Sequence, residues 1–106
     1  MDVATTHHID SSEPDALGRY EWRYEYDLYR FVDGETVLIA RSYVDETDEA
    51  HFLRIESAGN HRMLSKDDLR LPLFIQSMRY LRNAGKIKLQ WLSGRRNGYE
   101  LIKPDA

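Results

Sequence analysis

The residues of this sequence best suited to metal binding or proton transfer are its four histidines, and their spacing favours neither. His7 and His8 are adjacent, whereas His51 and His61 lie far from them in the chain. A metal site needs ligands that a helix or a hairpin brings together, and the adjacent pair has no further ligand at such a spacing. The sequence therefore predicts no metal site. It also contains no cysteine, which excludes disulfides and thiolate ligands.

Catalytic patterns are equally weak. A nucleophilic site needs a serine or cysteine beside a histidine and an acid, and no serine here has a nucleophile-elbow pattern. Glu25 and Asp27 form an acid pair, but on an alternating strand their side chains belong to the solvated face. Neither glycine-containing turn has the strand before it and the helix after it that a phosphate-binding loop requires. We therefore expect no cofactor and favour a non-catalytic protein. An enzyme using His51 or His61 would need a cleft that joins one of them to an acid.

Basic residues near the C-terminus form a candidate nucleic-acid site. Arginines at an exposed hairpin tip can bind phosphates, and Trp91 or Tyr99 could stack a base if its ring points outward. Against this, a pI near 5.8 is low for a nucleic-acid-binding domain, and basic edge strands also discourage aggregation. Nucleic-acid binding is therefore the alternative hypothesis, and its candidate residues are Lys86, Lys88, Arg95 and Arg96.

The net charge of −3 hides an uneven distribution. Residues 1–53 contain four bases and thirteen acids, a net charge of −9, whereas residues 54–106 contain eleven bases and five acids, a net charge of +6. In a compact domain the two halves interleave, and complementary charges then favour correct docking of one on the other. The functional alternative is an acidic surface and a basic surface that bind charged partners.

The leading candidate for a binding site is a row of aromatic residues in the N-terminal half of the chain. Four of them alternate with charged residues in a strict period of two: Tyr20, Trp22, Tyr24 and Tyr26. This pattern predicts a strand with one buried face. After Leu28 the phase changes, because Tyr29 and Phe31 occupy the side that the charged residues had used. A β-bulge near Leu28, or a strand covered on both faces there, would explain the change.

One helix is predicted, over Pro72–Asn83. At about 100° per residue, three apolar side chains fall on one side of it: Phe74, Met78 and Leu81. Proline suits the first helical position, and Gly85 is placed to end the helix. Ser65 and Asp68 have the spacing of a capping box, although aspartate reaches less far than the usual glutamate. A short helical turn is therefore expected over Lys66–Arg70.

Segments that alternate like strands surround the helix: 20–31, 36–44, 50–57, 86–92 and 99–103. With the helix, they predict a two-layer α+β fold, β-β-β-α-β-β, in which the helix packs on one face of an antiparallel sheet of about five strands. Residues 1–18 are polar and aperiodic, and they predict a flexible tail before a single domain over residues 19–104. Because this tail holds four acids and no apolar block, we expect neither a signal peptide nor a membrane span, and a cytoplasmic protein.

The aromatic row is too long for the helix to cover. A strand over residues 20–31 would extend roughly 40 Å, whereas a twelve-residue helix extends about 18 Å. A protein partner or a second copy would cover the remainder, since Tyr and Trp are prominent in interfaces. A sheet that curls over its own aromatic residues is the other explanation. The sequence thus favours a small protein-binding domain or homodimer whose contact residues are Tyr20, Trp22, Tyr24 and Tyr26.

Overall fold

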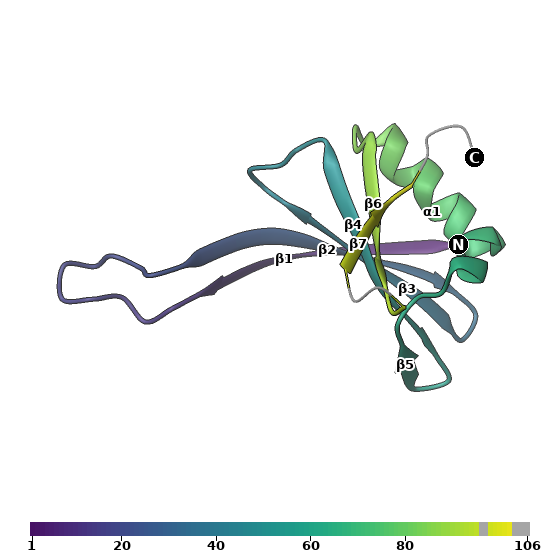
Figure 1. Ribbon diagram of the computed structural model, residues 1–106, viewed down its shortest axis with the longest axis horizontal. Helices are drawn as coiled ribbons and strands as arrows, with labels where there is room; N and C mark the ends of the chain where they lie inside the picture. Colours follow the sequence, from purple (N-terminus) through teal and green to yellow (C-terminus); the bar gives the residue numbers. More distant parts are fainter. Residues whose placement is uncertain (96–97, 103–106) are drawn as a thin grey trace.

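The computed structural model describes residues 1–95 and 98–102, and it shows one sheet with one α-helix against it (Figure 1). In chain order the elements are β1 (Asp2–Ser11), β2 (Arg23–Asp33), β3 (Thr36–Tyr43), β4 (Glu49–Ser57), β5 (Asn60–Arg62), the 3-10 helix η1 (Lys66–Arg70), α1 (Pro72–Asn83), β6 (Lys88–Ser93) and β7 (Gly98–Leu101). The strand order is β1-β2-β3-β4-β6-β7, with β5 paired to β4. The predicted α+β class is confirmed.

The predicted sheet of about five antiparallel strands needs correction, because seven strands form a mixed sheet. The first four residues of β4 pair in parallel with β6, and the last three pair antiparallel with β5. The parallel pair arises because α1 lies in the connection between β4 and β6, so β6 returns in the same direction. Side chains alternate in β6 in the same way beside a parallel or an antiparallel neighbour. The sequence pattern therefore could not reveal that β6 runs parallel to β4.

Strand β1 occupies much of the segment that the sequence predicted as a flexible tail. It pairs antiparallel with β2 along its whole length, from Asp2 opposite Val32 to Ser11 opposite Arg23. Most of its side chains are polar on both faces, which is why no amphipathic period is visible. Its outer edge is a sheet edge, where a polar strand can persist because it needs no buried face.

The outer parts of β1 and β2 form a hairpin that projects from the rest of the molecule (Figure 1). We define the arm as residues 9–24, because β3 pairs with β2 only from Tyr26 onward. Two groups of hydrogen bonds close its tip. The Ser12 amide donates to the Trp22 carbonyl at 3.0 Å, and the Asp15 carboxylate accepts the amides of Leu17 and Arg19 at 2.9 and 2.8 Å.

Helix α1 begins at Pro72 and ends at Asn83, as predicted, and it covers the inner face of the sheet. The Phe74 ring lies 4.4 Å from the Phe52 ring of β4, centroid to centroid. Tyr80 packs edge-on against Tyr29 and Phe31 of β2 at 6.4 and 5.7 Å. Within the described ranges, no helix is long and apolar enough to cross a bilayer.

The short helix η1 is fixed by a buried carboxylate. Asp68 accepts the Ser65 amide at 2.7 Å, so aspartate does complete the predicted capping box. It also accepts two hydrogen bonds from the Arg62 guanidinium, at 2.7 and 2.8 Å. These bonds, with those from Arg62 first in size, lower the pKa of Asp68 below its usual value although the residue is only 5% exposed.

Candidate protein-binding surface

Strand β2 presents different residues to the two faces of the sheet. Its pairing with β1 and β3 runs without a register shift from Arg23 to Asp33, so the β-bulge considered near Leu28 is absent from this strand. Strict alternation therefore directs Tyr29 and Phe31 toward α1, and Tyr24 and Tyr26 toward the opposite face. We call this opposite side the open face. The change of phase marks a strand with apolar residues on both faces in its inner half.

The open face carries a continuous series of rings from four strands. Trp22, next to β2, lies 5.8 Å from Tyr24, which lies 6.0 Å from Tyr43 of β3. Tyr43 also contacts Tyr26 at 5.9 Å and His51 of β4 at 6.2 Å. The series ends at Tyr99 of β7, 4.7 Å from His51. We call these six residues and Arg41 the ring surface. The sequence pattern placed Trp22, Tyr24 and Tyr26 in one row, but it did not bring Tyr43, His51 or Tyr99 to them, because that grouping depends on long-range register.

Arg41 lies at the centre of the ring surface. Its guanidinium carbon is 4.8 Å from the centre of the Tyr43 ring and 5.8 Å from that of Tyr26. Its Nη2 donates a hydrogen bond to the Tyr99 hydroxyl at 2.8 Å. Cation–π contacts and this hydrogen bond hold rings from three strands in fixed relative positions. Arg41 therefore links the inner part of the ring surface, formed by Tyr26, Tyr43 and Tyr99.

The outer part of the ring surface is accessible to solvent. Trp22 is 45% and Tyr24 53% exposed, and both line a hollow of about 610 Å³ together with Ile9, Asp10, Ser11, Tyr26, Arg41 and Tyr43. Within it, the Tyr26 hydroxyl donates to Asp10 at 2.6 Å, and this bond raises the pKa of Tyr26. Tyr20, the fourth predicted contact residue, is 48% exposed but precedes β2, in the segment that connects it to β1.

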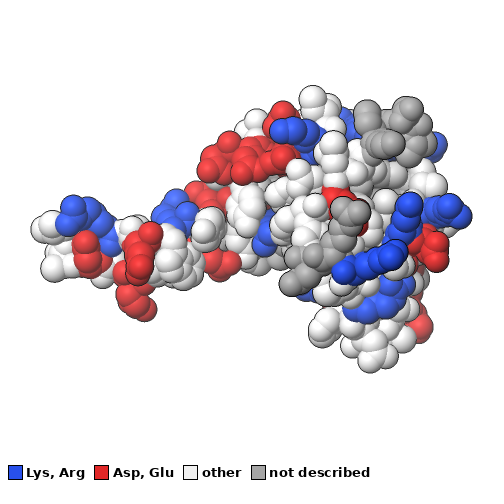
Figure 2. Space-filling view, in the orientation of Figure 1, with Lys and Arg blue, Asp and Glu red and all other residues white. Residues whose placement is uncertain are grey.

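Of the basic residues of the alternative hypothesis, three lie within the described part of the chain: Lys86, Lys88 and Arg95. Lys86 donates to the Thr47 carbonyl at 2.7 Å, and the Lys88 ammonium lies 3.9 Å from Glu49. Arg95 lies beyond the far end of β6, about 20 Å away at the usual rise per residue. Arg96 lies outside the described residues. In Figure 2 acidic atoms gather on the β3–β4 loop, the arm carries both acidic and basic atoms, and basic atoms gather toward the opposite end.

The acid pair Glu25 and Asp27 of β2 is joined by a histidine of the neighbouring strand β1. His7 Nδ1 lies 2.7 Å from Asp27, and His7 Nε2 lies 2.7 Å from Glu25. These hydrogen bonds, that to Asp27 first, raise the pKa of His7. The arrangement joins β1 to β2. Each ring nitrogen already has a carboxylate partner, so the geometry indicates a structural contact.

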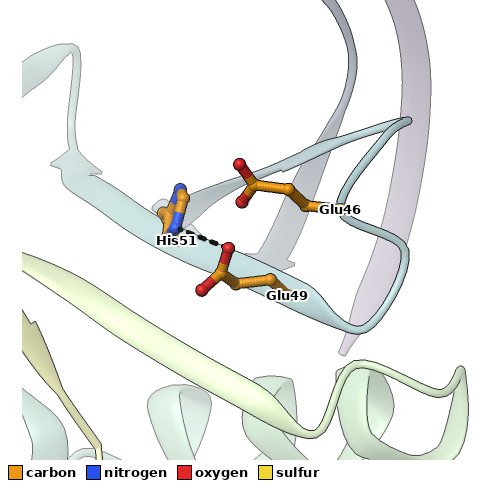
Figure 3. A group of neighbouring side chains, drawn as sticks. All are labelled: Glu46, Glu49 and His51. Atoms are coloured by element: carbon orange, nitrogen blue, oxygen red, sulfur yellow. Dashed lines mark ion pairs between the residues drawn. The ribbon is translucent and has the colours of Figure 1, made fainter.

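A second group of titratable side chains adjoins the ring surface (Figure 3). It consists of Glu46 in the β3–β4 loop with Glu49 and His51 on β4, and their nearest ligand atoms lie within 4.8 Å of one another. Burial lowers the pKa of His51, and a hydrogen bond with Glu49 raises the pKa of Glu46. The spacing of the four histidines predicted no metal site, although the Glu-x-His spacing of Glu49 and His51 places two ligands on one strand face.

His61, the other histidine considered for catalysis, lines a separate hollow of about 270 Å³. The described residues that line it are Thr36, Ile55, Ser57, Asn60, His61, Arg62 and Leu71, and they include no acid. Comparison of the chain with protein-family models, curated proteins and solved structures returned no match.

Proposed function

We propose that this protein is a protein-binding domain that recognises its partner, in the simplest case a second copy, through the ring surface. The observation that carries the proposal is the position of the exposed rings: Trp22 and Tyr24 lie on the face that α1 leaves uncovered, and each is about half exposed. Monomeric proteins seldom expose contiguous large apolar patches, and such patches often mark interaction sites.

The physical properties of the ring surface support this function. Aromatic rings bury a large area at a low cost in side-chain entropy, and Tyr, Trp and Arg are enriched among residues that dominate binding energy. Arg41 already fixes Tyr43 and Tyr99, so little further ordering is needed on binding. Asp10 and Arg41 add charges of both signs at the edge and centre of the hollow, which favours a partner of complementary polarity.

The first experiment measures self-association by sedimentation velocity over a range of concentrations. It compares the wild-type protein with a Trp22→Ala, Tyr24→Ala double variant and with an Ile75→Ala control. Ile75 is 36% exposed on α1, away from the open face. We expect a concentration-dependent dimer that the double variant weakens by at least about tenfold, because central aromatic residues often contribute 2 kcal/mol or more to binding, and that the control retains.

If the wild-type protein is a monomer, the same three proteins serve as baits in pull-down experiments. The proposal then requires a protein that the wild type and the control retain and the double variant loses, with circular dichroism showing that all three are folded. A monomer whose captured proteins are the same for all three baits would reject the proposal.

A further inference from the structure

The group formed by Glu46, Glu49 and His51 has the composition of a metal site. Two turn hydrogen bonds bring Glu46 over β4, from the Glu46 amide to the Tyr43 carbonyl and from the Glu49 amide to the Glu46 carbonyl, both at 3.1 Å. Glu49 and His51 are two residues apart on β4, so their side chains share a face of the strand. Three ligand atoms, two oxygens and one nitrogen, thus converge from a loop and a strand.

His51 is an independent indication that the group binds a ligand. The residue is only 9% exposed, and within the described part of the chain its Nδ1 is buried without a hydrogen-bond partner. Its Nε2 faces Glu49 Oε2 at 3.9 Å, which is too long for a hydrogen bond (Figure 3). A cation held between Glu49 and His51 would be ligated by Nε2, the nitrogen that faces Glu49, and would give the buried ring a partner at that atom but not at Nδ1.

Glu49 is held in an orientation suited to coordination. Its Oε1 lies 3.4 Å from the Gln90 amide nitrogen and 3.9 Å from the Lys88 ammonium. The other oxygen, Oε2, is the one that faces His51. Partners that orient a ligand from outside the metal's own coordination sphere are typical of protein metal sites. Lys88 also brings a competing positive charge, but its side chain is 62% exposed and can move into solvent.

We propose that Glu46, Glu49 and His51 bind one divalent transition-metal ion of the zinc type. Imidazole with carboxylates suits zinc, whereas magnesium and calcium prefer oxygen ligands alone. Two ligands at about 2.1 Å from a tetrahedral ion lie about 3.4 Å apart, so the 3.9 Å between His51 and Glu49 closes by about half an ångström. The exposed position of Glu46 leaves a fourth position to water. The ion would tie the β3–β4 loop to the ring surface through His51.

The test is calorimetric titration with Zn²⁺, with Mg²⁺ and Ca²⁺ as comparison ions. His7→Asn and His8→Asn are introduced throughout, to remove adventitious binding by the adjacent histidines. We expect one Zn²⁺ per chain, no binding of Mg²⁺ or Ca²⁺ at the same concentrations, and a loss of affinity of at least about tenfold in Glu46→Gln. Because Glu46 is exposed, this variant is expected to fold even if a change at His51 does not.

Two further variants separate the proposed site from general attraction of cations to acidic residues. Asp48→Asn removes a charge from the same loop at an exposed position outside the group and should leave Zn²⁺ affinity within about twofold. Lys88→Met removes the competing charge and should increase the affinity. Absence of Zn²⁺ binding, or equal affinity in Glu46→Gln and Asp48→Asn, would overturn the proposal.

Discussion

The arm and the body of this protein use aromatic residues in opposite ways. In the body, Phe31, Phe52 and Phe74 are at most 1% exposed and form the core beneath α1. In the arm, Trp22 and Tyr24 are about half exposed on a two-stranded hairpin. Core packing therefore explains the aromatic residues of the body, whereas it does not explain those of the arm.

The stability of β-hairpins gives a physical reason for the difference between the arm and the body. An isolated two-stranded hairpin is only marginally stable in water, and it needs a further layer or partner to become rigid. The arm has neither beyond the point where β3 ends. It is held by the hydrogen bonds at its tip and by the ring contacts at its inner end.

The largest expected difference between the arm and the body is in how much a lost aromatic ring lowers the free energy of unfolding. Phe52→Ala, in the body, should lower the free energy of unfolding by about 3–5 kcal/mol, because it removes a fully buried ring that packs on Phe74. Trp22→Ala, in the arm, should lower it by about 1 kcal/mol or less. Urea denaturation followed by circular dichroism measures both. Similar losses for the two variants would contradict the division into arm and body.

A smaller loss of stability is expected when Asp68 or Asp15, two aspartates that stabilise loops, is substituted. Asp68→Asn, in the body, should cost about 1.5–3 kcal/mol, because it weakens charge-assisted hydrogen bonds to a buried group. The folded-state pKa of Asp68 is lowered, so its contribution is present above the unfolded pKa near 4 and is lost as the pH falls through the folded value.

Asp15→Asn, at the arm's tip, is the matched control for Asp68→Asn. Asp15 also has a lowered pKa, chiefly because of the hydrogen bond from the Arg19 amide, but it is exposed. Its substitution should therefore change stability less. Urea titrations at neutral and acidic pH distinguish the two variants, and a larger loss from Asp15→Asn would reverse the assignment.

The smallest expected effect is the pH response of the contact between β1 and β2 at the base of the arm. The pKa of His7 is raised in the folded protein, so the stabilisation from His7 is complete below the unfolded pKa near 6.5 and is lost as the pH rises through the folded value. NMR titration should show a higher pKa for His7 in the wild type than in Asp27→Asn. Equal values would show that the contact with Asp27 is not populated in solution.

His51 in the body should respond with the opposite sign. Its pKa is lowered by burial, so its contribution is present above the unfolded pKa and is lost as the pH falls through the folded value. Acidification through the range below about 6.5 should therefore weaken packing around His51 while it strengthens the contact made by His7. Hydrogen exchange of the two regions at several pH values measures both effects.

Local patterns in the sequence predicted the elements that depend on local physics. Helix α1 and η1 have the predicted bounds, because amphipathic period, proline position and capping are all encoded within a few residues. The parallel pairing of β4 with β6 was not predictable, because it depends on the path of the intervening chain. Strand β1 escaped detection since a polar edge strand has no period.

The ring surface was predicted only in part, because local patterns reveal the residues of one strand but not their neighbours on other strands. Alternation identified Trp22, Tyr24 and Tyr26, which the structure brings together on the open face. The contributions of Arg41 and Tyr99 depend on register across several strands, and their separation in the chain gives no local signal. The direction of the open face depended on whether β2 contained a bulge, which the pattern left undecided.

The most direct test of the central claim is site-specific photo-cross-linking in the cells that contain this protein. A photoreactive residue is placed at position 24, on the open face, or at position 75, on α1; both positions are exposed. The account predicts a discrete protein adduct, either a second copy or another protein, from position 24 only, and its loss when Trp22→Ala is added. Adducts that are the same from both positions, or no adduct from position 24, would contradict it.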